Sequence, residues 1–445
     1  MIQLALLLFG DNFIFSKRKQ IILFGILWST FGTIIFIDGL DGVTYFPLRF
    51  FGLLLLTESL VTLIIASESN GGQKTLLYFK GGIFCFISIL ILSNISYCNF
   101  LLAIIFCFSY FSFGFLMTLS SWFLRFPRWK TFFMFGTSQI IFSILMITPY
   151  PTHYKATVSF ILGSIMFFSG INTVKLALRI RSTHKENPLS KYIATKNSYI
   201  KKNKNCEIIS KDMESYFTDA TVPLIVHIWT PEGTASTSII RRPIINRYIA
   251  AVDSDGVIST GHASLEIPNS IYISLYPAED IDRSPSEFVR ILKATCDNNV
   301  AGKFLPDYST EAAEWCHSNK QIFFTKYNIK SLQCFWSSYK ETQTYNLTNR
   351  NCSSSVAYAL ESALNGVLSD RSKNWFSIIR TLTMPEFWIA AQIRKRAISM
   401  AWTPGLVMDY ARALYCIINP VSPPWYQRIF LLWRRRKKYK THYHK

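Results

Sequence analysis

The sequence predicts an α-helical membrane domain with six spans, followed by an α+β domain that contains a small antiparallel sheet. Three observations support this prediction. Half of the 445 residues are hydrophobic and the mean hydropathy is +0.21, which is more apolar than an ordinary soluble protein. The long apolar runs all lie in residues 1–178. From residue 216 onward, short β-prone runs alternate with segments of helical periodicity.

The membrane domain is predicted from apolar runs that are each close to the roughly 20 residues needed to cross a hydrocarbon core. These runs are residues 20–38, 48–67, 76–95, 98–119, 131–149 and 157–178. Residues 1–10 are also apolar, but they lack a basic segment and a small-residue cleavage site, so we do not expect a cleaved signal peptide. An N-terminal turn in the membrane interface is the alternative.

The distribution of lysine and arginine predicts the orientation of the spans. With six spans, most of the basic residues flanking them fall on one side of the membrane, which is the side of both termini. The positive-inside rule therefore places the termini and the domain after the spans in the cytoplasm. Glu58 is the one acid well inside a predicted span, and no series of buried ionisable residues indicates an ion path, so we do not predict a transporter.

Glycine-containing segments within the first and last spans, residues 24–32 and 161–170, allow neighbouring helices to approach closely. The pattern of six short spans with such segments is similar to the HdeD family of small bacterial inner-membrane proteins. This resemblance implies a location in a bacterial inner membrane.

Basic segments flank the second domain. Residues 179–215 are rich in lysine, serine and asparagine and are expected to form a juxtamembrane linker. Residues 367–445 combine amphipathic helices with a basic tail; these helices either lie in the membrane interface or pack on the preceding domain. Because most of the formal charge of +20 lies beside the membrane, we expect anionic lipids as partners and no nucleic acid.

Cys352 is expected at the start of a helix. Residues 356–364 contain strong helix formers with apolar residues at helical spacing, Gly366 suits a left-handed C-cap, and Asn351 or Ser353 can cap the N-terminus. In the first turn, the free amide hydrogens and the helix dipole favour thiolate over thiol. Cys352 is therefore a candidate nucleophile.

His262 is expected on the first strand of a hairpin formed by residues 256–267 and 271–276, and it shares one face with Ser264 and Glu266. Glu266 lies about 13 Å along the strand, at about 3.3 Å per residue, and so cannot orient the His262 ring. The opposite strand brings Ser274 or Tyr276 nearest to His262, and neither is an acid.

The motifs Gly-His-Ala-Ser-Leu-Glu, Tyr-Ile-Ser-Leu-Tyr-Pro and Asn-Arg-Asn-Cys, in this order, resemble the circularly permuted papain-like group that includes NlpC/P60 and lecithin:retinol acyltransferase-like proteins. The resemblance implies a papain-like catalytic domain over residues 216–366. It also implies a thiolate from Cys352, a general base from His262 and an acyl-enzyme intermediate on an amide or ester.

These expectations lead to three functional hypotheses. A cysteine peptidase or amidase is the first, a lipid acyltransferase or phospholipase of the same fold is the second, and a catalytically silent membrane scaffold is the third. The substrate would be a membrane-associated protein or lipid. We expect no cofactor, and no zinc site, because no Cys-x-x-Cys or His-Glu-x-x-His occurs. His227 and His317 are interpreted as structural.

Overall fold

A computed structural model describes residues 1–40, 48–68, 71–93, 96–148, 156–181, 219–234, 239, 242–248, 250–252, 254, 258–279, 281 and 290–420. We predicted a helical N-terminal part followed by an α+β region with small antiparallel sheets, and the structure confirms this order. Most of the predicted basic linker and the basic tail after residue 420 lie outside the described residues.

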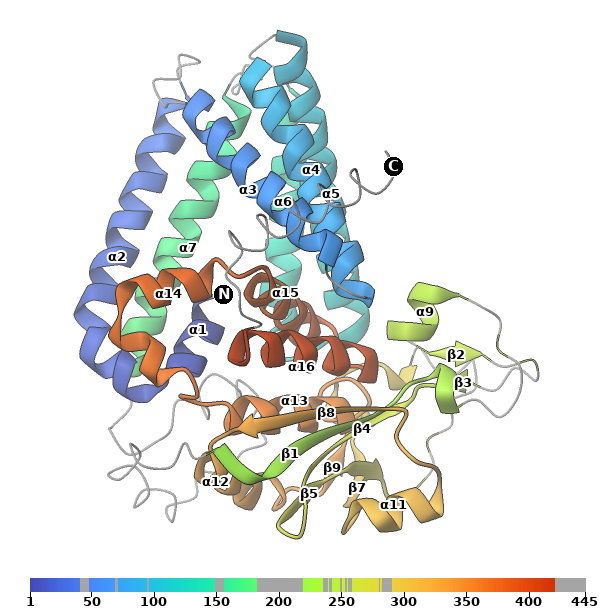
Figure 1. Ribbon diagram of the computed structural model, residues 1–445. Coiled ribbons are helices and arrows are strands. Elements are labelled where there is room, and N and C mark those ends of the chain that lie inside the picture. Colours follow the sequence, from blue (N-terminus) through green and yellow to red (C-terminus); the bar gives the residue numbers. More distant parts are fainter. Residues whose placement is uncertain are drawn as a thin grey trace, which may run out of the picture.

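The N-terminal part consists of helices that stand side by side in Figure 1. They are α1 (Ile2–Phe9), α2 (Asp11–Asp38), α3 (Leu48–Glu68), α4 (Gly71–Ser93), α5 (Ser96–Leu124), α6 (Trp129–Ile147) and α7 (Thr157–Arg181). Five helical segments of the described chain are long and apolar enough to cross a membrane. They are Ser16–Asp38, Arg49–Ser67, Cys98–Leu124, Trp129–Ile147 and Thr157–Leu178, and a shorter apolar stretch, Leu77–Ser93, lies in α4.

These helices contact one another mainly in three pairs: α2 with α7, α3 with α4, and α5 with α6. Glycines make the close approach possible. A Cβ on Gly163 of α7 would lie 2.7 Å from the carbonyl oxygen of Gly32 in α2. A Cβ on Gly136 of α6 would lie 2.9 Å from the carbonyl oxygen of Gly114 in α5. Backbones can pack at this distance only where side chains are absent.

The C-terminal part contains a four-stranded antiparallel sheet in the order β5-β4-β1-β8. Its strands are β1 (Asp219–Trp229), β4 (His262–Ile267), β5 (Ile271–Ile273) and β8 (Lys320–Lys326). Two smaller sheets are formed by β2 (Ala251–Val252) with β3 (Ile258–Ser259), and by β6 (Leu275–Pro277), β7 (Val300–Phe304) and β9 (Thr344–Tyr345). Helix α9 (Pro243–Tyr248) lies before β2 in the chain.

The four-stranded sheet has an apolar face and a polar face, as the alternation of side chains along a strand requires. Val226, Ile228 and Leu265 are fully buried on the apolar face, which is covered by α13 (Cys352–Ala363) and α16 (Pro404–Ile418). The polar face carries histidines on β1 and β4 and is covered by α11 (Tyr308–Glu314). Helix α12 (Ile329–Tyr339) packs beside α13.

Helix α1 is buried in the same apolar core as α13 and α16, and is not an exposed interfacial turn. Its carbonyl oxygens at Leu7 and Leu8 accept hydrogen bonds of 2.9 and 2.8 Å from the amides of Gly366 and Leu368. The first residues of the chain therefore close the core of the C-terminal part.

The chain after residue 366 forms η4 (Ser369–Lys373), α14 (Trp375–Leu382), α15 (Pro385–Ser399) and α16. Both α15 and α16 contribute buried residues to the core, so these two amphipathic helices pack on the preceding domain. Within them, Arg394 makes a buried two-point ion pair with Glu361 of α13, with N–O distances of 2.7 and 3.0 Å.

The C-terminal part packs directly against the helices of the N-terminal part (Figure 1). The amide of Ala294 donates a 2.6 Å hydrogen bond to the carbonyl oxygen of Leu124 at the end of α5. The Lys80 ammonium of α4 lies 5.0 Å from the ring centre of Trp388 in α15. The α+β region therefore meets the helices at the side where most of the basic residues that flank the apolar segments lie.

Candidate active site

Cys352 is the first residue of α13 and is 8% exposed. The start of this helix is set by a capping box. The Asn351 side-chain oxygen accepts a hydrogen bond of 2.8 Å from the Ser354 amide, and the Ser354 hydroxyl oxygen accepts one of 2.9 Å from the Asn351 amide. Because an amide at the first helical position has no acceptor within its own helix, the Cys352 amide is available to a ligand oxygen.

Arg350 holds the turn that precedes Cys352. Its buried guanidinium donates hydrogen bonds to the carbonyl oxygens of Tyr339, Thr342 and Thr344 at 2.9, 2.6 and 2.9 Å. It also lies 3.9 Å from the ring centre of Tyr339. Arg350 therefore joins the end of α12, strand β9 and the start of α13 into one rigid support.

His262 begins β4 and faces Trp229 of β1 in the strand register. The residue before it, Gly261, has a φ of 66°, and a Cβ there would lie 2.4 Å from the Trp229 carbonyl oxygen. Only glycine fits this conformation and this space without strain. Gly261 thus brings the chain into β4 with the His262 side chain on the polar face.

The Cys352 sulfur lies at the start of β4, beside the backbone of the residue that follows His262. The backbone amide of Ala263 donates a hydrogen bond to this sulfur. The Ser353 hydroxyl lies 3.7 Å from the same sulfur. The packing of α13 on β4 thus brings a residue far away in the chain to the strand that begins with His262.

The His262 ring is held on three sides. Its Nε2 lies 2.8 Å from the Ser274 hydroxyl and 3.2 Å from Oε1 of Glu311, and its face stacks on Tyr276 with ring centres 4.1 Å apart. Ser274 and Tyr276, the residues expected nearest to the ring, thus both contact it. Both of these polar contacts involve Nε2.

Glu311 is the acid that sequence reasoning missed. It lies in α11, is 1% exposed, and accepts hydrogen bonds from the hydroxyls of Tyr276, at 2.7 Å, and Tyr272. The Asp307 side chain caps α11 by accepting a 2.7 Å hydrogen bond from the Thr310 amide. The segment around Glu311 does not by itself indicate which strand the helix covers.

Burial shifts the pKa values of the three groups. It lowers the pKa of His262 to about 3 and raises the pKa of Cys352 above its ordinary value. Burial also raises the pKa of Glu311, while hydrogen bonds from Tyr272, Tyr276 and Ser274 act in the opposite direction. Desolvation thus opposes the thiolate that the helix start was expected to favour, while the hydrogen bonds from Ser353 and Ala263 lower the pKa of Cys352.

A pair of tryptophans covers the His262 side of the site. Trp229 is fully buried, with its ring centre 5.5 Å from that of His262, and its indole nitrogen donates to the Cys316 carbonyl oxygen at 2.8 Å. Trp315, at the end of α11, stacks on Trp229 and lies edge-on to His262. Trp315 is 45% exposed and so forms part of the outer rim of the site.

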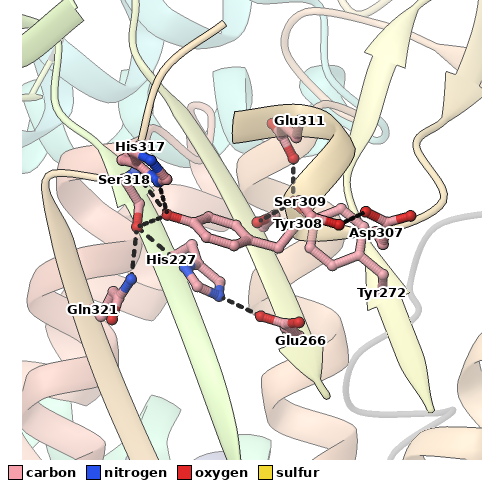
Figure 2. Close-up of polar contacts among 11 residues, drawn as sticks. His227, Glu266, Tyr272, Asp307, Tyr308, Ser309, Glu311, His317, Ser318 and Gln321 are labelled. Atoms are coloured by element: carbon pink, nitrogen blue, oxygen red, sulfur yellow. Dashed lines mark hydrogen bonds and ion pairs between the residues drawn. The ribbon is translucent and has the colours of Figure 1, made fainter. Parts of the chain in front are cut away.

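A second histidine cluster lies beside this site on the same face of the sheet (Figure 2). The Nε2 of His227 lies 2.8 Å from a Glu266 carboxylate oxygen, and its Nδ1 lies 3.1 Å from the Ser318 hydroxyl. Its ring stacks on Tyr308 of α11 with centres 4.1 Å apart. Glu266 thus binds His227, which agrees with the expectation that it lies too far along the strand to orient His262. Both ring nitrogens of His227 have a polar partner, as expected of a structural histidine.

Within the part of the chain that the structure describes, no group of three or more His, Cys, Asp or Glu side chains has the arrangement needed to hold a metal ion. Comparison of the chain with protein-family models, with curated proteins and with solved structures finds no match.

Proposed function

We propose that this protein is a membrane-anchored thiol hydrolase that uses Cys352 as nucleophile, His262 as general base and Glu311 as the acid that orients the base. Two contacts support the proposal most strongly: the Cys352 sulfur accepts a hydrogen bond from the amide of the residue after His262, and the His262 ring lies next to a buried carboxylate through Nε2. A nucleophile, its base and a group that orients the base are the parts that such a site requires.

The proposed reaction begins with a neutral pair. As the Cys352 sulfur attacks the substrate carbonyl carbon, its proton passes to Nδ1 of His262, and the Cys352 amide donates to the oxyanion. The C–N or C–O bond then breaks, and the imidazolium returns the proton to the leaving amine or alcohol. A water molecule, deprotonated by His262, attacks the thioester carbon, and release of the acid restores the thiol. Glu311 stabilises the imidazolium formed in both steps.

The substrate class that we place first is an amide bond in a membrane-associated protein. Esters of membrane lipids are the second candidate, and one observation favours them: the α+β region packs directly on the helices that are apolar enough to span the bilayer. In the proposed topology the six apolar segments, including the shorter one in α4, all cross a bacterial inner membrane. The site and both termini then face the cytoplasm.

Labelling by a thiol-reactive activity probe tests the proposal. We expect a carbonyl-directed electrophilic probe to label the full-length protein in a manner that depends on Cys352, His262 and Glu311. Cys352→Ala should abolish labelling and hydrolysis, whereas Cys296→Ala, which changes an exposed cysteine, should leave both intact. Full hydrolytic activity in the Cys352→Ala protein would refute the assignment.

Substrate comparison separates the remaining hypotheses. Release of amine from peptides supports a peptidase or amidase, and release of fatty acid from phospholipid vesicles supports the lipid enzyme. A correctly folded protein with neither activity and no Cys352-dependent labelling is the result expected of a silent scaffold.

A further inference from the structure

Helix α14 presents an apolar face that the rest of the described chain leaves exposed. Trp375, Phe376 and Ile379 are 56%, 73% and 57% exposed, while Ile378 and Thr381 on the opposite side are buried. These exposures differ from those of α15 and α16, whose apolar residues enter the core. An exposed aromatic and aliphatic cluster on one side of a short helix is typical of a surface that contacts another apolar phase.

The position of α14 indicates which phase it meets. Figure 1 shows α14 beside the lower part of α2 and above α1. The turn η4, directly before α14, contacts α1 and α2. Helix α14 itself contacts α15. Helix α15 in turn contacts α5, and its Trp388 ring lies next to the Lys80 ammonium of α4. Helix α14 is therefore held at the end of the helical bundle that meets the α+β region.

The surface of α2 continues the apolar face. Beyond its basic residues Lys17, Arg18 and Lys19, α2 exposes a row of large apolar side chains within a segment long enough to span the membrane, including Leu23, Phe24, Leu27 and Phe31. The change from basic to apolar residues indicates the level at which a bilayer interface would lie. Tryptophan is the residue type most enriched at this level.

The charges around α14 suit the same surroundings. Arg380 is exposed on α14, and Lys373, which pairs with the exposed Asp370 at 3.0 Å, is exposed in η4 just before it. Arg371 anchors the turn by donating hydrogen bonds of 2.8 Å to the carbonyl oxygens of Ile417 and Ile418 at the end of α16. An apolar cluster with cations on either side along the helix matches acyl chains below a layer of anionic headgroups.

We propose that α14 lies in the membrane interface, with Trp375, Phe376 and Ile379 in contact with lipid acyl chains and with Lys373 and Arg380 at the headgroups. The partner is the bilayer itself. Such a contact fixes the height and tilt of the α+β region on the membrane, independently of whether that region is a hydrolase.

Photocrosslinking of the full-length protein in vesicles of phosphatidylcholine and phosphatidylglycerol tests this proposal. The photoreactive amino acid p-benzoylphenylalanine replaces Phe376, an aromatic-for-aromatic exchange at an exposed position. A matched control carries it at Phe323, which is 46% exposed on β8, and a positive control carries it at Phe31 of α2. Mass spectrometry of the irradiated protein identifies lipid adducts and protein crosslinks.

The expected result is lipid adducts at Phe376 and Phe31, with several-fold fewer at Phe323. Adducts at Phe31 without adducts at Phe376 would overturn the proposal. A crosslinked dimer through Phe376 would also overturn it, because a second copy of the chain would then cover this face. Loss of Phe31 adducts would show that the protein is not inserted, and α14 would then have no bilayer to meet.

Discussion

Oε1 of Glu311 lies 3.2 Å from Nε2 of His262, and the two side chains come from a helix and a strand that the sequence does not pair in any obvious way. This contact fixes the orientation of the imidazole ring and the nitrogen that carries its proton. In the proposed mechanism the ring proton lies on Nε2, toward the carboxylate and Ser274, and the lone pair of Nδ1 accepts the proton of the thiol.

The first prediction concerns this contact. Glu311→Gln should lower kcat by on the order of 10²-fold or more, because the amide no longer stabilises the imidazolium or selects its tautomer. The measurement is the pH profile of kcat together with the thermal unfolding midpoint. Glu266→Gln makes the same change at the His227 pair and should leave kcat within about twofold, because His227 has no role in the proposed reaction. Equal losses of kcat in the two variants would contradict the assigned role of Glu311.

A second prediction follows from the protonation states. Because burial raises the pKa of Cys352, its thiolate forms only as the pH rises through and beyond the ordinary thiol range. The rate of alkylation of Cys352 by iodoacetamide, followed on its peptide by mass spectrometry, should therefore still be rising where a small free thiol has reached its plateau. A resting thiolate–imidazolium pair would instead give a rate that is already constant at mildly acidic pH.

The third prediction concerns the buried ion pair between Glu361 and Arg394. The carboxylate accepts two hydrogen bonds from Arg394 and one of 3.0 Å from Tyr410, and the same arginine donates to Gln3 in α1 at 3.0 Å. Glu361→Gln leaves the arginine charge uncompensated in the core and should reduce the free energy of unfolding by about 3–5 kcal/mol.

The exposed pair of Asp370 and Lys373, with side chains 88% and 79% exposed, supplies the control. Asp370→Asn should change the unfolding free energy by less than about 1 kcal/mol, because exposed ion pairs contribute little. Chemical unfolding of both variants in the same detergent makes the comparison. Similar losses of unfolding free energy in the two variants would show that the ion pair between Glu361 of α13 and Arg394 of α15 does not stabilise the core as we describe.

A fourth prediction concerns the junction between α1 and the core. Gly10 has a φ of 83°, and a Cβ there would lie 2.7 Å from the Cα of Gly366. Gly10→Ala therefore combines backbone strain with a steric clash and should cost about 1–3 kcal/mol of stability. Gly82→Ala adds a methyl group where nothing lies within 4 Å, in the middle of α4, and should be neutral or stabilising by up to about 1 kcal/mol. A stable Gly10→Ala protein would show that α1 does not dock as described.

Much of the site could be predicted because it depends on local sequence. The apolar runs, the start of α13 at Cys352, and the hairpin that carries His262 are each encoded within one short segment. The expected hairpin predicts Ser274 and Tyr276 near the histidine, although the observed pairing of β4 with β5 ends at Ile273 and Tyr276 lies in β6, which pairs with β7. Glu311 could not be found in this way, because the sequence of residues 307–314 does not indicate which strand α11 covers. The pairing of Glu266 with His227 likewise depends on the register of β1 with β4.

The sequence alone determined the division into apolar helices and an α+β region, because hydrophobic run length and periodicity are properties of single segments. Only the tertiary structure decided the burial of Cys352, which raises the pKa of its thiol, since burial depends on how every other segment packs around the sulfur. It also decided the fate of the amphipathic segments: α1, α15 and α16 enter the core, while α14 keeps its apolar face outside. An apolar face requires a covering surface, but its sequence does not specify which surface that is.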